Sequence, residues 1–128
     1  MKKKRMGQFL IFNQIKFDPD GYLADKPRNG SQEDEKALRQ AMKSLGFEIH
    51  SFENTRTWEI LIEINKYSSE QDHRDYNAFG LAFFSHGDER GNLYTFDGRI
   101  HINELVKPFV QQIYLLGKPK LFFIQGLN

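Results

Sequence analysis

The chain has 128 residues, of which 39% are apolar and 14% aromatic, which suits one compact domain with a single core. Its 18 Lys and Arg nearly cancel its 17 Asp and Glu, so no global positive charge indicates a nucleic-acid or anionic-membrane partner. The absence of cysteine excludes a thiolate nucleophile, a disulfide and a thiolate metal site, and the four histidines lack the spacing of a zinc site, so we expect no metal or cofactor.

The chain begins with the basic tract Met1–Arg5, which is more typical of a solvated terminus than of a targeting or phosphate-binding signal. No leader-like segment and no run of 18 apolar residues follows, so we expect an unexported, cytoplasmic protein. The nearly continuous apolar run 8–13 predicts a strand buried on both faces, as in a parallel sheet. Two clusters of turn residues between Phe17 and Gly30 then predict a loop.

The first predicted helix follows this loop directly. Ser31 is typical of an N-cap, with Asp34 three residues later in an acidic first turn that suits the helix dipole. Gly46 is typical of the residue that caps the end of a helix. One apolar face recurs at helical spacing and comprises Ala37, Leu38, Ala41, Met42 and Leu45. The sequence therefore predicts a helix that packs through this face.

A strand and a second helix are expected next. Residues 47–51 alternate between apolar and polar side chains, which predicts a half-exposed strand. Thr57 is expected to cap a helix that runs to about Tyr67. Its apolar face comprises Ile60, Leu61, Ile64 and Tyr67. The polar stretch 68–77 predicts a surface loop.

The apolar run 78–84 predicts a third strand, which is followed by Ser85-His86-Gly87. A turn-rich segment comes after it and contains Asp97-Gly98, a strong hairpin signal. We expect a small β-ribbon there, with residues 93–96 paired to residues 99–102.

A third helix and a last strand complete the chain. The helical face comprises Leu105, Val106, Phe109, Val110 and Ile113. Because proline fits poorly inside a helix, the regular part is expected to begin at Pro108. The last strand is predicted at 120–125, where the apolar residues are again nearly continuous.

Alternation of buried strands with amphipathic helices predicts an α/β fold: a three-layer α/β/α arrangement around a mostly parallel sheet of four core strands, with a small β-ribbon added. Ligands of such sheets bind at the carboxyl ends of the strands, near the point where strand order reverses. Three segments therefore share one candidate crevice: the loop containing Arg28, the segment Ser85-His86-Gly87, and the segment Gln125-Gly126-Leu127. Each is a weak signal alone, but together they favour a site.

Several stretches, taken in this order, resemble the large subunit of the caspases, a family of cysteine endopeptidases. They are Leu10–Asn13, Arg28–Ser31, Leu45–Phe47, Ser85–Gly87 and Gly117–Gln125. The resemblance covers essentially the whole chain. It implies a single domain over residues 1–128 with a caspase-like sheet, and neither an interaction prodomain nor a small-subunit domain is recognised in these residues.

The resemblance also implies roles for the candidate site residues. His86 matches the catalytic histidine of the family, and the backbone N–H of Gly87 matches an oxyanion donor. Arg28, Gln125 and Ser85 match the large-subunit side of the pocket that holds the substrate aspartate. The chemistry agrees, because a planar guanidinium gives a carboxylate two parallel charge-assisted hydrogen bonds.

After Gln125 the chain departs from the family signature Q-A-C-[RQG]-G. Gly126 stands in place of Ala, Leu127 in place of the catalytic Cys, and Asn128 in place of Arg or a near equivalent. Because a leucine side chain cannot attack a carbonyl, we expect no peptidase activity from this chain on its own.

Three hypotheses about function are open from the sequence. The chain is a catalytically dead caspase homologue that regulates caspases in apoptosis by associating with a caspase small subunit or a caspase homologue, binding a peptide aspartate weakly if at all. Alternatively, it is a truncated or alternatively spliced product of the gene for an aspartate-specific cysteine endopeptidase. The third hypothesis, a non-proteolytic small-molecule-binding α/β domain, is disfavoured because residues 13–16 carry no Gly-rich fingerprint.

Overall fold

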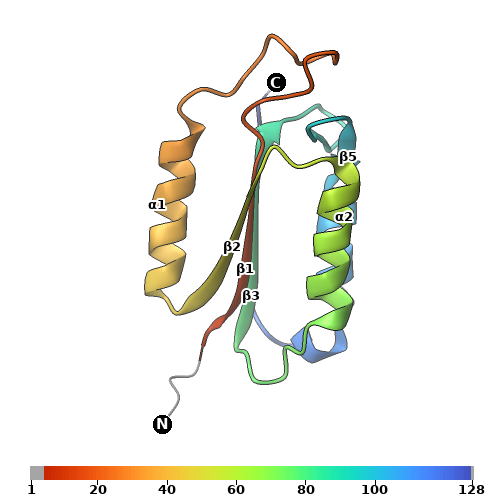
Figure 1. The fold of residues 1–128 in the computed structure, drawn as a ribbon. Helices are drawn as coiled ribbons and strands as arrows, with labels where there is room; N and C mark the ends of the chain where they lie inside the picture. The colour runs from red at the N-terminus through yellow and green to blue at the C-terminus, as the bar shows by residue number, and fades with distance from the viewer. Residues whose placement is uncertain (1–4, 128) are drawn as a thin grey trace.

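The computed structural model describes residues 5–127, and its main feature is a four-stranded parallel sheet between two layers of helices (Figure 1). The strands lie in the order β2-β1-β3-β6, and every neighbouring pair is parallel. Their bounds are β1 Gly7–Asn13, β2 Phe47–Glu53, β3 Ala78–His86 and β6 Lys120–Leu127. This confirms the predicted α/β/α fold and all four predicted core strands.

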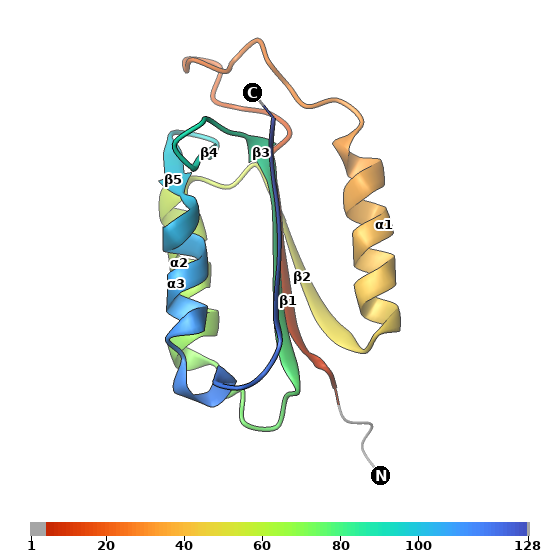
Figure 2. The same cartoon turned by 180° about the vertical axis from the view of Figure 1, so that it is seen from behind.

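The helices cover opposite faces of the sheet because the chain reverses direction across it. Helix α1 (Ser31–Ser44) connects β1 to the edge strand β2, whereas α2 (Thr57–Asn65) and α3 (Ile102–Val110) precede β3 and β6 on the other side of β1. Right-handed crossovers then place α1 on one face and α2 with α3 on the other, as Figure 2 shows from behind. The reversal lies between β1 and β3.

Side chains of β1 alternate between two cores, one on each face of the sheet. Phe9 and Ile11 pack on the side of α1, while Leu10 and Phe12 pack on the side of α2 and α3. All four are fully buried. A continuous apolar run therefore indicates a strand covered on both faces, as the sequence predicted.

Helix α1 is where predicted, but its cap and its packing face differ from the prediction. Gly30, with a φ of 86°, occupies the N-cap, and Ser31 is the first helical residue. Leu45 is the C-cap and Gly46, with a φ of 99°, follows it. The side chains that pack toward the sheet are Ser31, Glu35, Leu38 and Met42, whereas Ala37, Ala41 and Leu45 are exposed. The polar Ser31 and Glu35 displace the apolar stripe because both have hydrogen-bond partners beneath the helix.

Helix α2 starts at Thr57, which is its first residue and not its cap. The Glu59 carboxylate accepts from the N–H of Arg56 at 2.9 Å, and Asp97 accepts from the N–H of Thr57 at 2.9 Å. A π-helical turn, Lys66–Glu70, continues the helix into the predicted loop. On the predicted face Ile60, Ile64 and Tyr67 are buried, but Leu61 is exposed.

Helix α3 begins six residues earlier than predicted and holds Pro108 in its last turn. The His101 ring accepts from the N–H of Asn103, and Glu104 accepts from the N–H of His101, so the helix start is capped. The fully buried side chains of Leu105 and Phe109 anchor the rest of helix α3. These contacts offset the hydrogen bond that proline forfeits. Ile113, expected on the same face, lies beyond the helix in a short 3₁₀ turn, Ile113–Leu115, and is exposed.

The β-ribbon is present as two short antiparallel strands, β4 (Asn92–Tyr94) and β5 (Arg99–His101), on either side of the predicted turn. In the four-stranded sheet, β2 and β6 are the edges. Among the described residues, no helix is both long enough and apolar enough to cross a membrane.

Candidate functional site

A cavity of about 460 Å³ opens at the carboxyl ends of the parallel strands. Arg28, His86 and Gln125 all line it, although they belong to three different parts of the chain. The cavity lies beside β1 and β3, where the order of the strands reverses, as expected for a ligand site in an open sheet. The remaining lining comes from Pro27, the turn 29–31 and Asp34. The structure thus brings together three of the residues singled out by the sequence.

Arg28 is held mainly by the segment that follows β1. Its guanidinium Nη1 donates to Asn13 Oδ1 at 3.1 Å and to the carbonyl oxygen of Gln14 at 2.9 Å, and its main-chain N–H donates to the Ile15 carbonyl at 2.8 Å. The residue is only 7% exposed, and its Nε has no hydrogen-bond partner among the described residues. Burial lowers the pKa of Arg28, while the Asp34 carboxylate opposes this shift. A partly desolvated cation with a spare N–H favours an anionic ligand.

Asn13, the last residue of β1, connects Arg28 to the start of α1. Its Oδ1 accepts from Arg28 and, at 3.1 Å, from the hydroxyl of Ser31. The side chain is almost completely buried. Sequence reasoning missed this role, although a polar residue at the end of an apolar strand was its visible signal.

His86 is the last residue of β3 and forms a wall of the cavity. Its Nε2 lies 2.9 Å from the carbonyl oxygen of Lys26, and its ring centroid lies 5.5 Å from that of Phe17. Because a carbonyl can only accept, this contact places a proton on Nε2. His86 also lines a second cavity, of about 560 Å³, together with Lys26 and Gly87. The imidazole therefore stands between two hollows, of which only the first contains Arg28.

The ends of β3 and β6 run close together. Leu127 is the register partner of His86, and Gly126 is that of Ser85. A Cβ atom added to Gly126 would lie 3.3 Å from the Cα of Gly87, so the two glycines allow a close approach of the main chains. Leu127, which by the resemblance stands in place of the catalytic Cys, is thus paired with His86 in the register of the two strands.

Ser85 does not line the cavity, contrary to the expectation that it binds substrate. It is fully buried, and its hydroxyl donates to the carbonyl oxygen of Tyr94 at 2.6 Å. The strand continues through His86, so neighbouring side chains point to opposite faces and only His86 faces the cavity. Ser85 instead joins β3 to the ribbon.

The donor set of the cavity suits a carboxylate. A buried guanidinium and the amide of Gln125 supply N–H donors, and Arg28 keeps a positive charge at neutral pH. Over residues 5–127, no three His, Asp or Glu side chains gather in a way that could hold a metal ion.

Comparison with known proteins gives one consistent result. Residues 6–126 match a family model described as Caspase domain. Caspase-6 of Bos taurus is 37% identical over 128 residues, covering 98% of this chain and 42% of that protein, and Caspase-7 of Gallus gallus is 35% identical, covering 98% and 40%. The crystal structure of Caspase-1 from Spodoptera frugiperda superposes with a TM-score of 0.88 at 35% identity, covering 96% of this chain and 48% of that one. The chain thus spans about two fifths to one half of the length of these relatives.

Proposed function

This chain belongs to the caspase family, and we propose that it is a proteolytically inactive member that regulates caspase activity by association. The observation that carries the proposal is the pair formed by Leu127 and His86 in the β3–β6 register. Caspase chemistry needs a thiolate beside the histidine, but leucine has neither a lone pair nor an ionisable proton. None of the 128 residues is a cysteine that could take its place.

The Arg28 pocket is proposed to bind an aspartate side chain weakly. Arg28 and Gln125 would supply the donors for its carboxylate, with His86 and the N–H of Gly87 next to the following carbonyl. By the resemblance to caspases, the other half of this pocket belongs to the small subunit. The affinity of this chain alone is therefore expected to be low.

Titration with an aspartyl peptide tests the pocket. Backbone resonances near Arg28 and Gln125 should shift at millimolar peptide, while the matched asparaginyl peptide, which lacks the charge, should shift them much less. Equal responses to the two peptides, or none to either, would remove the basis for a carboxylate site.

The regulatory part of the proposal rests on β6. Within the described residues, β6 pairs with β3 on one side only. Phe122 and Ile124 pack on the core beneath α2 and α3, while Phe123 is 40% exposed on the other face. An unpaired apolar edge strand is a template for another strand. We propose that a strand of a caspase small subunit adds to this edge, which would either sequester that subunit or support a partner's active conformation. Without it, self-association is expected.

Co-expression with a caspase small subunit tests the association. A soluble complex is expected, weakened by Phe122→Lys, by Ile124→Lys or by the more exposed Phe123→Lys, because charge on an edge strand opposes pairing. Ile62→Lys on the exposed side of α2 is the matched control and should leave the complex intact. Circular dichroism of each variant separates lost pairing from lost folding. A monomeric, well-folded chain that does not co-purify with the subunit would exclude this role.

A truncated or alternatively spliced product of a caspase gene remains the alternative. The family match over residues 6–126 fits this alternative equally well. The complete product would then be an aspartate-specific cysteine endopeptidase. Sequencing the transcript beyond codon 125 separates the two: an in-frame Ala-Cys-Arg-Gly exon supports the fragment, and an unbroken Gly-Leu-Asn reading in all transcripts supports the inactive homologue.

A further inference from the structure

We propose that Gln14 is a positioning residue for the Arg28 pocket, an inference that rests on the carboxylate site proposed above. Gln14 directly follows β1, is completely buried and does not line the cavity. Its main-chain carbonyl oxygen contacts Arg28, and its side chain contacts Thr55 in the loop between β2 and α2. Through Gln14, the β2–α2 loop would therefore hold the Arg28 guanidinium in position.

Every polar group of Gln14 has a partner. Its N–H donates to the Phe84 carbonyl at 2.8 Å, and its carbonyl oxygen accepts from Arg28 Nη1 at 2.9 Å. In the side chain, Oε1 accepts from the N–H of Thr55 at 2.8 Å, and Nε2 donates to Thr55 Oγ1 at 2.9 Å and to the Thr55 carbonyl at 3.2 Å. Rotation of this amide would leave several buried groups unpaired, which fixes its orientation.

Asn54, the residue before Thr55, contacts the same segment. Its Oδ1 accepts from the N–H groups of Ile15 and Lys16 at 2.8 and 2.9 Å, and its own N–H donates to the Asn13 carbonyl. Asn54 has a φ of 51°, a left-handed conformation that is uncommon outside glycine. The side chains of Gln14 and Asn54 thus connect residues 13–16 to the β2–α2 loop.

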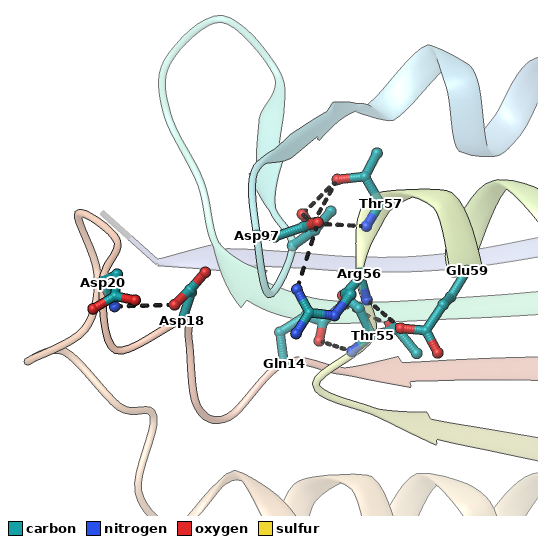
Figure 3. Close-up of polar contacts among 9 residues, drawn as sticks. Gln14, Asp18, Asp20, Thr55, Arg56, Thr57, Glu59 and Asp97 are labelled. Atoms are coloured by element: carbon teal, nitrogen blue, oxygen red, sulfur yellow. Dashed lines mark hydrogen bonds and ion pairs between the residues drawn. The ribbon is translucent and has the colours of Figure 1, made fainter.

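The β4–β5 ribbon closes this arrangement into a ring, part of which is drawn in Figure 3. The Thr55 carbonyl accepts from the N–H of Phe96 at 2.9 Å, and the Phe96 carbonyl accepts from the N–H of Asp18 at 3.0 Å. Asp97, the next residue, holds the N–H of Thr57. Three loops from distant parts of the chain therefore form one hydrogen-bonded frame around the segment that contacts Arg28.

Arg28 contacts this frame through the segment 13–15. Three hydrogen bonds connect them: two from Nη1 and one from the main-chain N–H of Arg28. A guanidinium binds a carboxylate well only in a fixed planar orientation. Loss of the Gln14 amide should release the segment and, with it, the loop that carries Arg28.

Hydrogen exchange followed by mass spectrometry tests this on the full chain without ligand, at micromolar concentration where self-association is least. Gln14→Leu removes the amide, and Thr55→Val removes only the hydroxyl acceptor. The stability control is Ile64→Val, a core change in α2 away from these loops. Peptides covering residues 24–31 contain the Arg28 N–H and report the pocket loop. The protection of these peptides against exchange is compared between each variant and the wild-type chain, after correction for the difference in melting temperature.

Exchange over residues 24–31 is expected to rise about tenfold in Gln14→Leu, equal to about 1.4 kcal/mol, and by less in Thr55→Val. It should not change in Ile64→Val. Loop exchange that follows global stability alone would overturn the positioning role, and Thr55→Val decides it if Gln14→Leu does not fold.

The second readout is the aspartyl-peptide titration, whose initial slope should fall about tenfold in Gln14→Leu. A wild-type chain that ignores the peptide would refute the carboxylate site, yet the exchange comparison would still decide whether Gln14 positions Arg28. An unchanged slope in a folded Gln14→Leu chain refutes the positioning role by itself.

Discussion

The stability of this chain should fall as the pH drops from neutral, because burial disfavours the charged form of His73 and lowers its pKa. The ring is completely buried next to Tyr76 and Phe79. Its Nε2 lies 2.5 Å from the carbonyl oxygen of Tyr67, so the second proton would have to bind Nδ1, which is buried and has no hydrogen-bond partner among residues 5–127. Burial is the main cause that lowers the pKa of His73. The hydrogen bond to Tyr67 and the Asp72 carboxylate oppose this shift, whereas Lys118 adds to it.

The sign follows from proton linkage. A folded-state pKa below the unfolded value means that the unfolded chain binds more protons, so the free energy of unfolding decreases as the pH falls below about 6.5. If His73 stays neutral when folded, lowering the pH from about 7.5 to about 5 costs about 2 kcal/mol, which is the upper limit for one histidine. His50 adds a smaller loss, because burial lowers its pKa but Glu48 opposes the shift. Carboxylates contribute little there, since they are ionised in both states above about pH 5.

Urea denaturation at these two pH values measures the effect. His73→Leu should lose stability at both pH values but show a smaller difference between them, because the contribution of His73 is gone and that of His50 remains. His50→Gln is the matched control and should keep most of the difference. If the wild-type free energy of unfolding is the same at both pH values, or if His73→Leu keeps the full difference, His73 is not held neutral by burial.

Three further changes test the core, the cap of α2 and the missing nucleophile. Phe109→Ala should lower the free energy of unfolding by about 3–5 kcal/mol, because the ring is fully buried and its centroid lies 3.9 Å from that of a β3 phenylalanine; a urea-measured loss below about 1 kcal/mol would contradict this. Asp97→Ala should cost about 1 kcal/mol by leaving the first N–H of α2 without its acceptor, whereas a conservative Asp97→Asn should cost less on the same assay. Leu127→Cys should not produce cleavage of a fluorogenic aspartyl peptide, since in the proposed function half of the specificity pocket belongs to a caspase small subunit. Turnover that His86→Ala abolishes, in this variant or in the parent chain, would show the proposed inactivity to be wrong.

The parallel sheet was predictable because its signal is local. The runs 8–13 and 78–84 are nearly continuous in apolar residues, a pattern typical of a strand buried on both faces. The reversal of strand order was not visible in any one segment. It follows from connectivity, since right-handed crossovers with helices on both faces require it.

Helix boundaries were less predictable because distant groups decide them. Pro108 marks a helix start on local grounds, yet α3 begins at Ile102, where the His101 ring and Glu104 supply the cap. The face of α1 was misjudged because Glu35 is buried through a hydrogen bond from Ser51, a partner on β2. A hydrophobicity pattern assigns every polar residue to the exposed face, even one that is buried with a hydrogen-bond partner.

The difference between local signals and contacts with distant residues also explains which parts of the candidate site could be predicted from the sequence. Arg28, His86 and Gln125 were expected at one crevice because topology brings the carboxyl ends of parallel strands together, and all three line the same cavity. Asn13 and Gln14 were missed because the hydrogen-bond partners of their side chains lie 15 to 41 residues away, at spacings that no local pattern encodes. Their signal is energetic: a buried amide at the end of an apolar strand is costly unless all of its groups are paired. A polar pair that terminates such a strand should therefore be taken as the anchor of the loops around the site.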